Sequence, residues 1–223
     1  MTQVRDPGVE DIARRVPGLR PRPQDWLVPA TVTGSLVPFA VIFARGVTGR
    51  LGANPIATAL NQLGLLALLF LVTGLACTPL KLVFGWTWPI RIRRTLGLFA
   101  FAAASLHFVV YALLDQLLMV RAIAVDIAKR PFILVGFVAL VLLVPLALTS
   151  SKQMLMRLGF RRWKLLHRLT YLVVVLGLVH FFLRVKADVW EPAGYALVVL
   201  VLFSVRLGFA WAARRNRSAL GVH

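Results

Sequence analysis

Charged residues are scarce in this chain, and acidic residues are the scarcest of them. Only 15% of the 223 residues are charged, and 8 Asp and Glu stand against 26 Lys and Arg. A soluble domain carries about 25% charged residues, so the composition argues against a soluble protein. The net charge of +18 would suggest nucleic-acid binding in a soluble protein. Here the basic residues lie between apolar runs, where loops meet anionic lipid headgroups, and we therefore exclude a nucleic-acid partner.

Cysteine is nearly absent as well. The single Cys77 rules out an intramolecular disulfide, a Cys-ligated zinc site and an iron–sulfur cluster held by this chain alone. Its simplest interpretation is a small apolar residue inside a helix. The chain also lacks a glycine-rich phosphate loop after a strand. We therefore expect no nucleotide-binding soluble domain, and the polar, Pro-rich residues 1–26 do not resemble a signal peptide.

Long apolar runs dominate what is present. Hydrophobic residues make up 59% of the chain, and they fall in runs of about 20 residues, the length that a helix needs to cross roughly 30 Å of hydrocarbon. We predict an all-α membrane protein, a six-helix transmembrane bundle. Residues 1–26 and 213–223 are expected to be tails, and residues 27–212 the transmembrane domain. The six spans are expected at 27–45, 56–78, 95–118, 132–150, 164–184 and 192–212.

The distribution of Lys and Arg predicts the orientation of the bundle. The N-terminal tail, the second and fourth loops and the C-terminal tail together hold 17 of these residues, whereas the three alternate loops hold 7. Cytoplasmic loops carry the excess of positive charge, so both termini are predicted to be cytoplasmic. The remaining two, Arg168 and Arg206, lie near predicted cytoplasmic helix ends, from which a long side chain can snorkel to the interface.

Three of the four histidines lie inside the predicted spans. His107 is in the third span, and His167 and His180 are in the fifth. An ionisable side chain inside a membrane is costly, so each is a candidate functional residue. For a single His, an interhelical hydrogen bond is an equally good explanation, and His223 at the chain end is under no such constraint. The three histidines are therefore more informative together than any one alone.

Distances along the spans place two of these histidines at one depth. His107 lies 13 residues after Arg94, about 20 Å along a helix, whereas His180 lies 16 residues after Lys164, about 24 Å. His167 lies near the cytoplasmic boundary, and about 220° of helix rotation separates it from His180, so those two do not share a face. Two imidazoles at one depth can hold a haem iron from both sides of the porphyrin. Zinc fits less well, because no carboxylate or Cys lies at a similar depth.

Three stretches of the sequence resemble the MsrQ (YedZ) family. They are TLGLFAFAAASLHFVVYALLD (95–115), KRPFILVGFVALVLLVPLALTS (129–150) and RRWKLLHRLTY (161–171). The resemblance covers about residues 25–215, and the family belongs to the ferric-reductase-like transmembrane domains, relatives of the membrane halves of NADPH oxidases. The third stretch contains the pattern R-x-W-x-x-L-H-x-L-x-Y, formed by Arg161, Trp163, Leu166, His167, Leu169 and Tyr171.

The resemblance implies an electron-transfer subunit of an oxidoreductase complex rather than its catalytic subunit. MsrQ proteins are multi-pass subunits of the bacterial inner membrane that hold haem b, and FMN as well. They take electrons from the quinone pool and supply MsrP, a periplasmic molybdopterin-containing methionine-sulfoxide reductase, as a heterodimer that supports repair of oxidised periplasmic proteins. His107, His167 and His180 match the three membrane histidines of the family, which makes all three expected cofactor ligands.

The chain also departs from its larger relatives. Two-haem oxidases carry a further His upstream of the one in the third span, where this chain has Arg93 and Arg94. The flavin-and-nicotinamide domain of the oxidases is not expected after the sixth span. Electrons must then arrive from a quinol or from a separate flavoprotein. The basic, aromatic loops 79–94 and 151–164 could suit a flavin phosphate or a quinol, but interface anchoring by Trp and Arg is the better explanation for any single residue in them.

Three other functions fit the sequence less well than electron transfer. A transporter with a histidine proton relay or metal pathway would need acidic partners inside the bundle, and none is deep in these spans. A purely structural anchor would not need three histidines within the membrane, and a stand-alone oxidoreductase would need the missing soluble domain.

We expect electrons to move outward through a haem held by His107 and His180. His167 is expected to serve a second cofactor or the electron entry site. The short outer loops 46–55, 119–131 and 185–191 are expected to form a flat platform for the periplasmic subunit.

Overall fold

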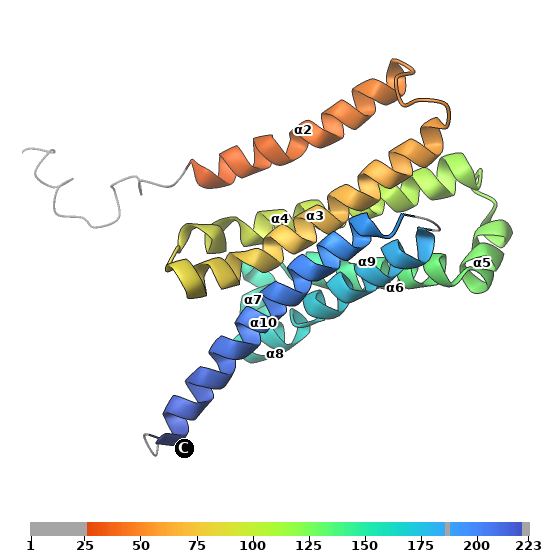
Figure 1. The fold of residues 1–223 in the computed structure, drawn as a ribbon. Helices are drawn as coiled ribbons and strands as arrows, with labels where there is room; N and C mark the ends of the chain where they lie inside the picture. The colour runs from red at the N-terminus through yellow and green to blue at the C-terminus, as the bar shows by residue number, and fades with distance from the viewer. Residues whose placement is uncertain (1–25, 186–187, 220–223) are drawn as a thin grey trace, which may run out of the picture.

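The computed structural model describes residues 26–185 and 188–219, and these residues form helices joined by short connections (Figure 1). No strand occurs in that part of the chain. The predicted tail over residues 1–26 lies almost wholly outside the described residues, as does His223. In chain order the helices are α2 (Leu27–Val47), α3 (Pro55–Phe84), α4 (Trp88–Val110), the π-helical turn η1 (Tyr111–Asp115), α5 (Val120–Lys129), α6 (Pro131–Leu148), α7 (Lys152–Leu158), α8 (Phe160–Leu166), α9 (Leu169–Arg184) and α10 (Trp190–Ala219).

Six helical segments are long and apolar enough to cross a membrane, which confirms the predicted six-span bundle. The third begins at Trp88, seven residues earlier than expected, because α3 ends at Gly85 in a left-handed conformation and Pro89 starts the next helix. It ends at Asp115, because Leu117 and Leu118 adopt positive φ angles of 50° and 57°. The sixth helix continues to Ala219, past the boundary expected at residue 212.

Two connections that were expected to be loops contain helices. Residues 119–131 hold the ten-residue helix α5, so this part of the outer platform is not a flat loop. Residues 151–164 hold α7 and most of α8, each seven residues long. The α2–α3 connection, α5, the end of α9 and the start of α10 gather at one end of the bundle, which we term the α5 end, and the opposite end we term the α7–α8 end (Figure 1).

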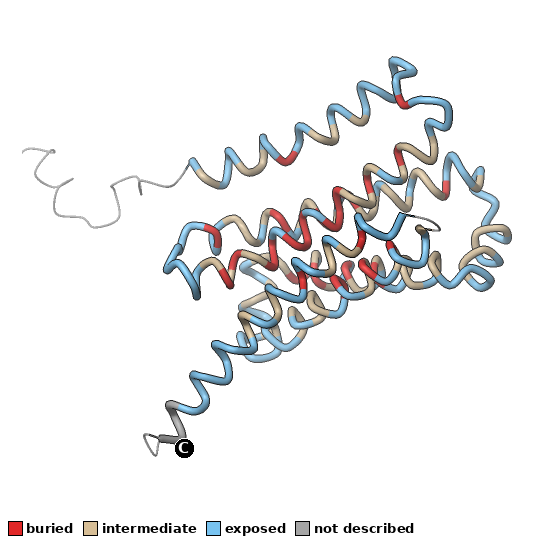
Figure 2. The backbone as a smooth tube through the Cα atoms, viewed as in Figure 1, coloured by how far each residue is buried: buried red, intermediate tan, exposed pale blue. Residues whose placement is uncertain are grey.

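Helix α3 lies at the centre of the bundle. In the most apolar stretch of 18 residues in α3, 61% of the residues are buried, whereas the corresponding share is 6% in α2 and in α10. Figure 2 shows the same contrast. Cys77 is part of this core, as its simplest interpretation predicted. Because α2 and α10 leave most of their apolar side chains exposed, they border lipid, whereas α3, α4, α6 and α9 form the inner part of the bundle.

The fifth span is interrupted at the histidine of the R-x-W-x-x-L-H-x-L-x-Y pattern. Helix α8 ends at Leu166, His167 is its C-cap, and α9 starts at Leu169. The rotation counted on one ideal helix between His167 and His180 therefore does not apply. The interruption lies at His167 and Arg168.

Candidate functional site

His107 of α4 and His180 of α9 lie next to each other inside the bundle. Their ring centroids are 6.1 Å apart and their ring planes are 89° apart. Both rings line a cavity of about 480 Å³ between α3, α4, α6 and α9. The structure thus brings together the two histidines that helix rise places at one depth.

A backbone carbonyl fixes the same tautomer in each ring. Nδ1 of His107 lies 2.8 Å from the carbonyl oxygen of Leu60, and Nδ1 of His180 lies 2.6 Å from that of Phe132. A carbonyl oxygen can only accept, so Nδ1 carries the proton and donates it in both histidines. Nε2 then keeps its lone pair in both rings. This arrangement is the one that metal-ligating histidines generally have.

A glycine makes room for each of these rings. A Cβ atom at Gly136 would lie 2.7 Å from Nδ1 of His180, and one at Gly64 would lie 3.2 Å from Nδ1 of His107. The first distance is shorter than any real Cβ contact, and the second is tighter than most. Only glycine therefore lets α6 approach His180 so closely, and Gly64 has the same role on α3 to a smaller degree.

The two halves of the site repeat one construction. In α3 the carbonyl of Leu60 is followed four residues later by Gly64, and in α6 the carbonyl of Phe132 is followed four residues later by Gly136. Residues four apart share a helix face, so each face offers a histidine one carbonyl acceptor and, at the glycine, a notch that accommodates the imidazole ring. The histidine follows its acceptor by 47 residues in the first case and by 48 in the second.

The histidine pair fits an iron porphyrin better than a bare metal ion. No group of three or more metal-binding side chains occurs in the described part of the chain, whereas zinc takes four ligands. A porphyrin iron asks the protein only for axial ligands. A first-row metal lies about 2 Å from an imidazole nitrogen, and that nitrogen lies about 1 Å from its ring centre, so two axial imidazoles have centroids about 6 Å apart. The 6.1 Å separation agrees with that value.

The cavity is polar at the α5 end. Arg130, Arg184, Asp115 and Glu191 are the charged residues among those that line it. Arg184 donates to Asn61 Oδ1 at 2.7 Å and lies over the ring of Phe181. Both arginines are exposed on one side, so their charge is available at the cavity rim.

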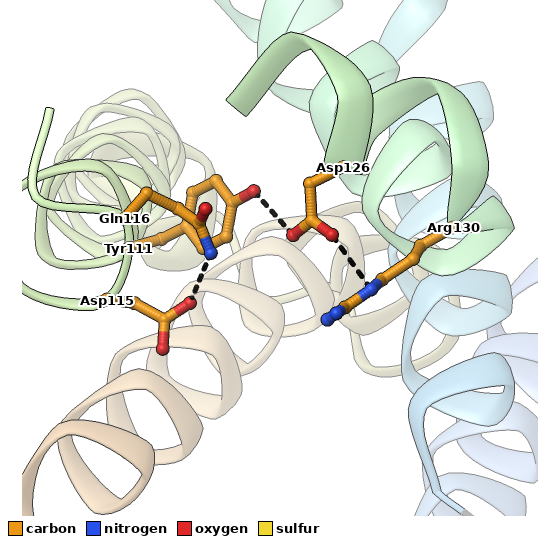
Figure 3. A network of polar contacts seen from close by, with 5 residues as sticks. All are labelled: Tyr111, Asp115, Gln116, Asp126 and Arg130. Carbon is orange, nitrogen blue, oxygen red and sulfur yellow. Dashed lines mark hydrogen bonds and ion pairs between the residues drawn. The ribbon is translucent and has the colours of Figure 1, made fainter. Parts of the chain in front are cut away.

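A network of polar contacts holds Arg130 in place (Figure 3). Its Nε donates to Asp126 Oδ1 at 2.8 Å, and the hydroxyl of Tyr111 donates to Asp126 Oδ2 at 2.9 Å. Both carboxylate oxygens of Asp126 are thereby used. Nearby, Gln116 donates to Asp115 at 2.9 Å. Tyr111 opens the π-helical turn η1, a feature that often marks functional sites.

His167 does not join this pair. Its ring stacks on Trp163 with centroids 4.1 Å apart, and its Nε2 lies 3.2 Å from the hydroxyl of Thr149. Trp163 in turn donates from Nε1 to the carbonyl of Thr149 at 2.9 Å. His167 is not among the residues that line the cavity, so the structure separates it from His107 and His180.

Comparison with known proteins agrees with the helical architecture. Residues 58–178 match the model of the family described as ferric reductase like transmembrane component. A relative from Deinococcus radiodurans, a protein-methionine-sulfoxide reductase heme-binding subunit MsrQ, is 47% identical over 201 residues, which are 90% of this chain and 98% of that protein. The chain belongs to the MsrQ family. Its predicted resemblance to MsrQ is thus confirmed.

Other MsrQ relatives are equally similar. The MsrQ protein of Rhodospirillum rubrum is 49% identical over 85% of this chain and 90% of its own length. That of Ralstonia nicotianae is 44% identical over 84% and 87%, respectively. Each carries the same name as the first relative. No solved structure matches the chain.

The sequence interpretation found the histidines and missed what holds them. Neither backbone acceptor and neither glycine notch was singled out, and Arg206 was assigned only a snorkelling role. One signal was available for the notches: L-x-x-x-G at 60–64 and F-x-x-x-G at 132–136 stand 72 residues apart, almost the same offset as His107 and His180. When a glycine and a histidine recur at nearly the same offset along the chain, the contact between their helices can be expected to recur as well.

Proposed function

We propose that this chain is a membrane electron-transfer subunit that holds one b-type haem between His107 and His180. In this proposal it takes electrons from the quinone pool and passes them to a periplasmic MsrP-like molybdopterin subunit that reduces methionine sulfoxide. The single observation that supports it best is the pair of facing histidines with both Nδ1 atoms engaged by carbonyls. The names of the relatives, which describe heme-binding subunits of a reductase, point to the same function.

The residues of this chain supply position and ligands for that haem. His107 and His180 would ligate the iron through Nε2, and the haem would then supply an iron that accepts and releases one electron. The carbonyls of Leu60 and Phe132 orient the two rings. An oriented, neutral imidazole binds iron without first losing a hydrogen bond.

The charged rim suggests which way the haem faces. A haem b carries two propionates, which need cations or water. Arg130 and Arg184 are the only cations among the residues that line the cavity, and both lie at its α5 end. The walls towards the centre of the bundle are apolar, with Ala139, Leu143 and Val173. We therefore place the propionates at the α5 end and the apolar edge of the porphyrin towards the α7–α8 end.

The orientation in the membrane follows from the charge distribution. With the termini cytoplasmic, the α7–α8 end faces the cytoplasm and the α5 end faces the periplasm. The histidine pair then lies towards the periplasmic side of a bacterial inner membrane, and electrons move outward. The boundaries of the membrane domain, 27–212, and of the two tails belong to this proposal as well.

FMN belongs to the proposal because of the family resemblance. Its phosphate would need cations, and the α7–α8 end offers them. A surface cavity of about 700 Å³ there is lined by Arg161, Arg162, Lys164 and Arg168 together with two apolar residues. The same residues also suit anionic lipid headgroups, so phosphate binding there is tested separately from haem binding.

An absorption spectrum of the purified protein tests the haem. We expect a sharp Soret band and b-type α and β bands after reduction, at one haem per chain for the His107–His180 site. A colourless preparation from haem-replete cells would refute the proposal and leave a structural or transport role.

Reconstitution into oriented vesicles tests the direction of electron flow. A quinol is supplied in the membrane, and impermeant electron acceptors of different colour are placed inside and outside. Reduction should occur on the side of Trp190, opposite to the chain termini. Reduction only on the side of the termini would show that the direction is wrong.

A further inference from the structure

Arg206 of α10 is an arginine within the sixth membrane span whose partners are all uncharged. Its Nη2 donates to the carbonyl of Leu75 at 2.8 Å, and its Nη1 donates to the hydroxyl of Tyr171. The guanidinium also lies over the Tyr171 ring, 5.3 Å from the centroid. Tyr171 is the last residue of the R-x-W-x-x-L-H-x-L-x-Y pattern, so Arg206 links that pattern to α3 and α10.

One hydrogen-bond donor of Arg206 is left without a partner. Its Nε is the one buried side-chain nitrogen or oxygen atom without a hydrogen bond in the described part of the chain. An unsatisfied donor inside a protein is costly, and in a native structure it often marks a place for a ligand or water. No carboxylate of the described residues lies within 4.0 Å of Arg206, although a charge within a membrane normally has a counter-charge.

A second arginine, Arg93, contacts the part of α3 that Arg206 contacts. Its Nη1 lies 3.4 Å from the hydroxyl of Thr78, and Thr78 stands three residues after Leu75, whose carbonyl accepts from Arg206. Residues three apart share a helix face. Neither arginine has an ion-pair partner among the described residues, which favours an anion beside this part of α3.

We propose that Arg206 and Arg93 form the cationic part of an electron-donor site that binds a quinone headgroup through a negatively charged ring oxygen. The isoalloxazine ring of a flavin shares this chemistry, and the experiments below separate the two. This inference rests on the proposed function, since it names the site at which electrons enter. A lipid-soluble ring can reach Arg206 directly, because α10 borders lipid and Leu207 and Gly208 beside it are exposed.

The chemistry of a quinol explains why a cation is needed there. A quinol loses two electrons and two protons in all. Loss of both protons and one electron leaves a radical anion, and loss of the second electron leaves the neutral quinone. A haem held by His107 and His180 would take up these electrons one at a time, and both protons would pass to water at the α7–α8 end. Two guanidinium groups stabilise the radical anion by charge-assisted hydrogen bonds, which lowers the barrier to the first electron transfer.

The position of the site suits this role. Tyr171, which contacts Arg206, lies nine residues before His180 on α9, and that separation is about 14 Å along the helix. Arg206 therefore lies between the α7–α8 end and the histidine pair, on the side where the donor would enter.

The test uses the full-length protein with its haem, in lipid nanodiscs. Arg206→Gln and Arg93→Gln remove the charge and keep a hydrogen-bonding group, and Arg206→Lys keeps the charge. Arg157→Gln on α7 is the matched control, because Arg157 is an exposed arginine at the same end that lines neither cavity. The rate of haem reduction is measured with a water-soluble quinol and, separately, with photoreduced FMN. Low-spin haem content and thermal unfolding are measured for every variant.

We expect Arg206→Gln to slow quinol-driven reduction about tenfold or more, with haem content unchanged. Arg206→Lys should recover part of the rate, Arg93→Gln should show a smaller loss, and Arg157→Gln should behave as wild type. A loss with photoreduced FMN alone would assign the site to a flavin ring and overturn the quinone assignment. Unchanged rates with both donors, or equal slowing in the control, would overturn the whole inference.

A second measurement covers the case in which the Arg206 variants fail to fold. An azidoquinone is photo-crosslinked to the wild-type protein, and the labelled peptides are identified. Labels should fall on α3, α9 and α10 near Leu75, Tyr171 and Arg206, and labels only elsewhere would refute the site. This readout needs no haem, so a colourless protein that is still labelled at Arg206 would refute the proposed function and not the donor site.

Discussion

Nδ1 of His180 lies 2.7 Å from the position that a Cβ atom would take at Gly136, and it also donates to the carbonyl of Phe132 on the same helix. The ring is thus held between an acceptor and a backbone that has no side chain at the contact. Such an arrangement leaves the His180 ring little freedom to move. Movement away from α6 breaks the hydrogen bond, and movement towards α6 produces a steric clash.

Gly136→Ala should therefore disturb the haem without changing any ligand. The new methyl group must displace the His180 ring and weaken its bond to the Phe132 carbonyl. Loss of such a supporting contact lowers metal affinity by about 10-fold or more. Haem content and the low-spin absorption of the purified variant measure the effect.

Two glycines serve as comparisons for this change. Gly64→Ala should show a smaller loss, because its Cβ would meet the His107 ring at 3.2 Å. Gly97→Ala on α4 has nothing within 4 Å and should retain wild-type haem. If all three variants bind haem equally, the glycine notches do not position the histidines.

Each histidine variant should have its own spectrum. His107→Ala and His180→Ala should lose most of the haem and convert any remainder to high spin, because one axial ligand is gone. His167→Ala should keep the low-spin spectrum and slow its reduction, since His167 contacts Trp163 and Thr149 apart from the pair, at the end where we propose that electrons enter. Loss of the low-spin haem in His167→Ala, with His107→Ala unaffected, would require a different axial pair.

Electron paramagnetic resonance checks the same pair in the wild-type protein. The two ring planes are 89° apart. Axial imidazoles that stand nearly perpendicular leave two iron d orbitals close in energy, which gives ferric low-spin haem a single dominant low-field signal. A fully rhombic spectrum with three well-resolved signals would indicate parallel rings and contradict this geometry.

Arg184→Gln should lower the haem midpoint potential. A cation at the propionate end stabilises the reduced iron, which carries one positive charge fewer than the oxidised iron, so its removal makes reduction harder. The rim is partly exposed to water, and we expect a shift of about 20–60 mV, where about 59 mV corresponds to a tenfold change for one electron. Arg121→Gln is the control, because Arg121 lies on α5 and does not line the cavity. An equal shift in both variants would count against the propionate assignment.

A cross-linking residue at Trp190 should capture the periplasmic subunit that we propose. Trp190 is 84% exposed at the start of α10, at the α5 end of the bundle. Asp126 is a poorer probe than its loop position suggested, because both of its carboxylate oxygens are engaged by Tyr111 and Arg130. Probes at Lys81 or Arg157 on the opposite face serve as controls. Capture only from that face would mean that the partner docks at the α7–α8 end.

Composition and the length of the apolar runs were sufficient for the number of membrane spans. Apolar runs of membrane-spanning length can satisfy their backbone groups in lipid only as helices, so six runs predict six spans whatever their tertiary contacts. Helix rise alone also placed His107 and His180 at one depth. The family followed from short stretches around His107 and His167, which carry specific residues at fixed spacing.

Helix ends and the interruption of the fifth span could not be obtained in that way. The third span ends at Asp115 because Leu117 and Leu118 turn the chain with positive φ angles, and leucine has no intrinsic preference for that conformation. Helix α8 stops before His167, where the imidazole contacts Thr149 of a different helix. Contacts between helices determine where these helices end, and such contacts cannot be inferred from the sequence of one helix alone.

The sequence by itself determined that this protein is a six-span membrane bundle with histidines at matching depth. Only the tertiary structure decided which nitrogen of each histidine is free, because that depends on carbonyls of Leu60 and Phe132 lying 47 and 48 residues away. It also decided that Arg206 meets Tyr171 and the Leu75 carbonyl and keeps one donor unpaired. Depth along a helix is a local property that follows from residue count, whereas hydrogen-bond partners depend on how helices rotate and pack against one another.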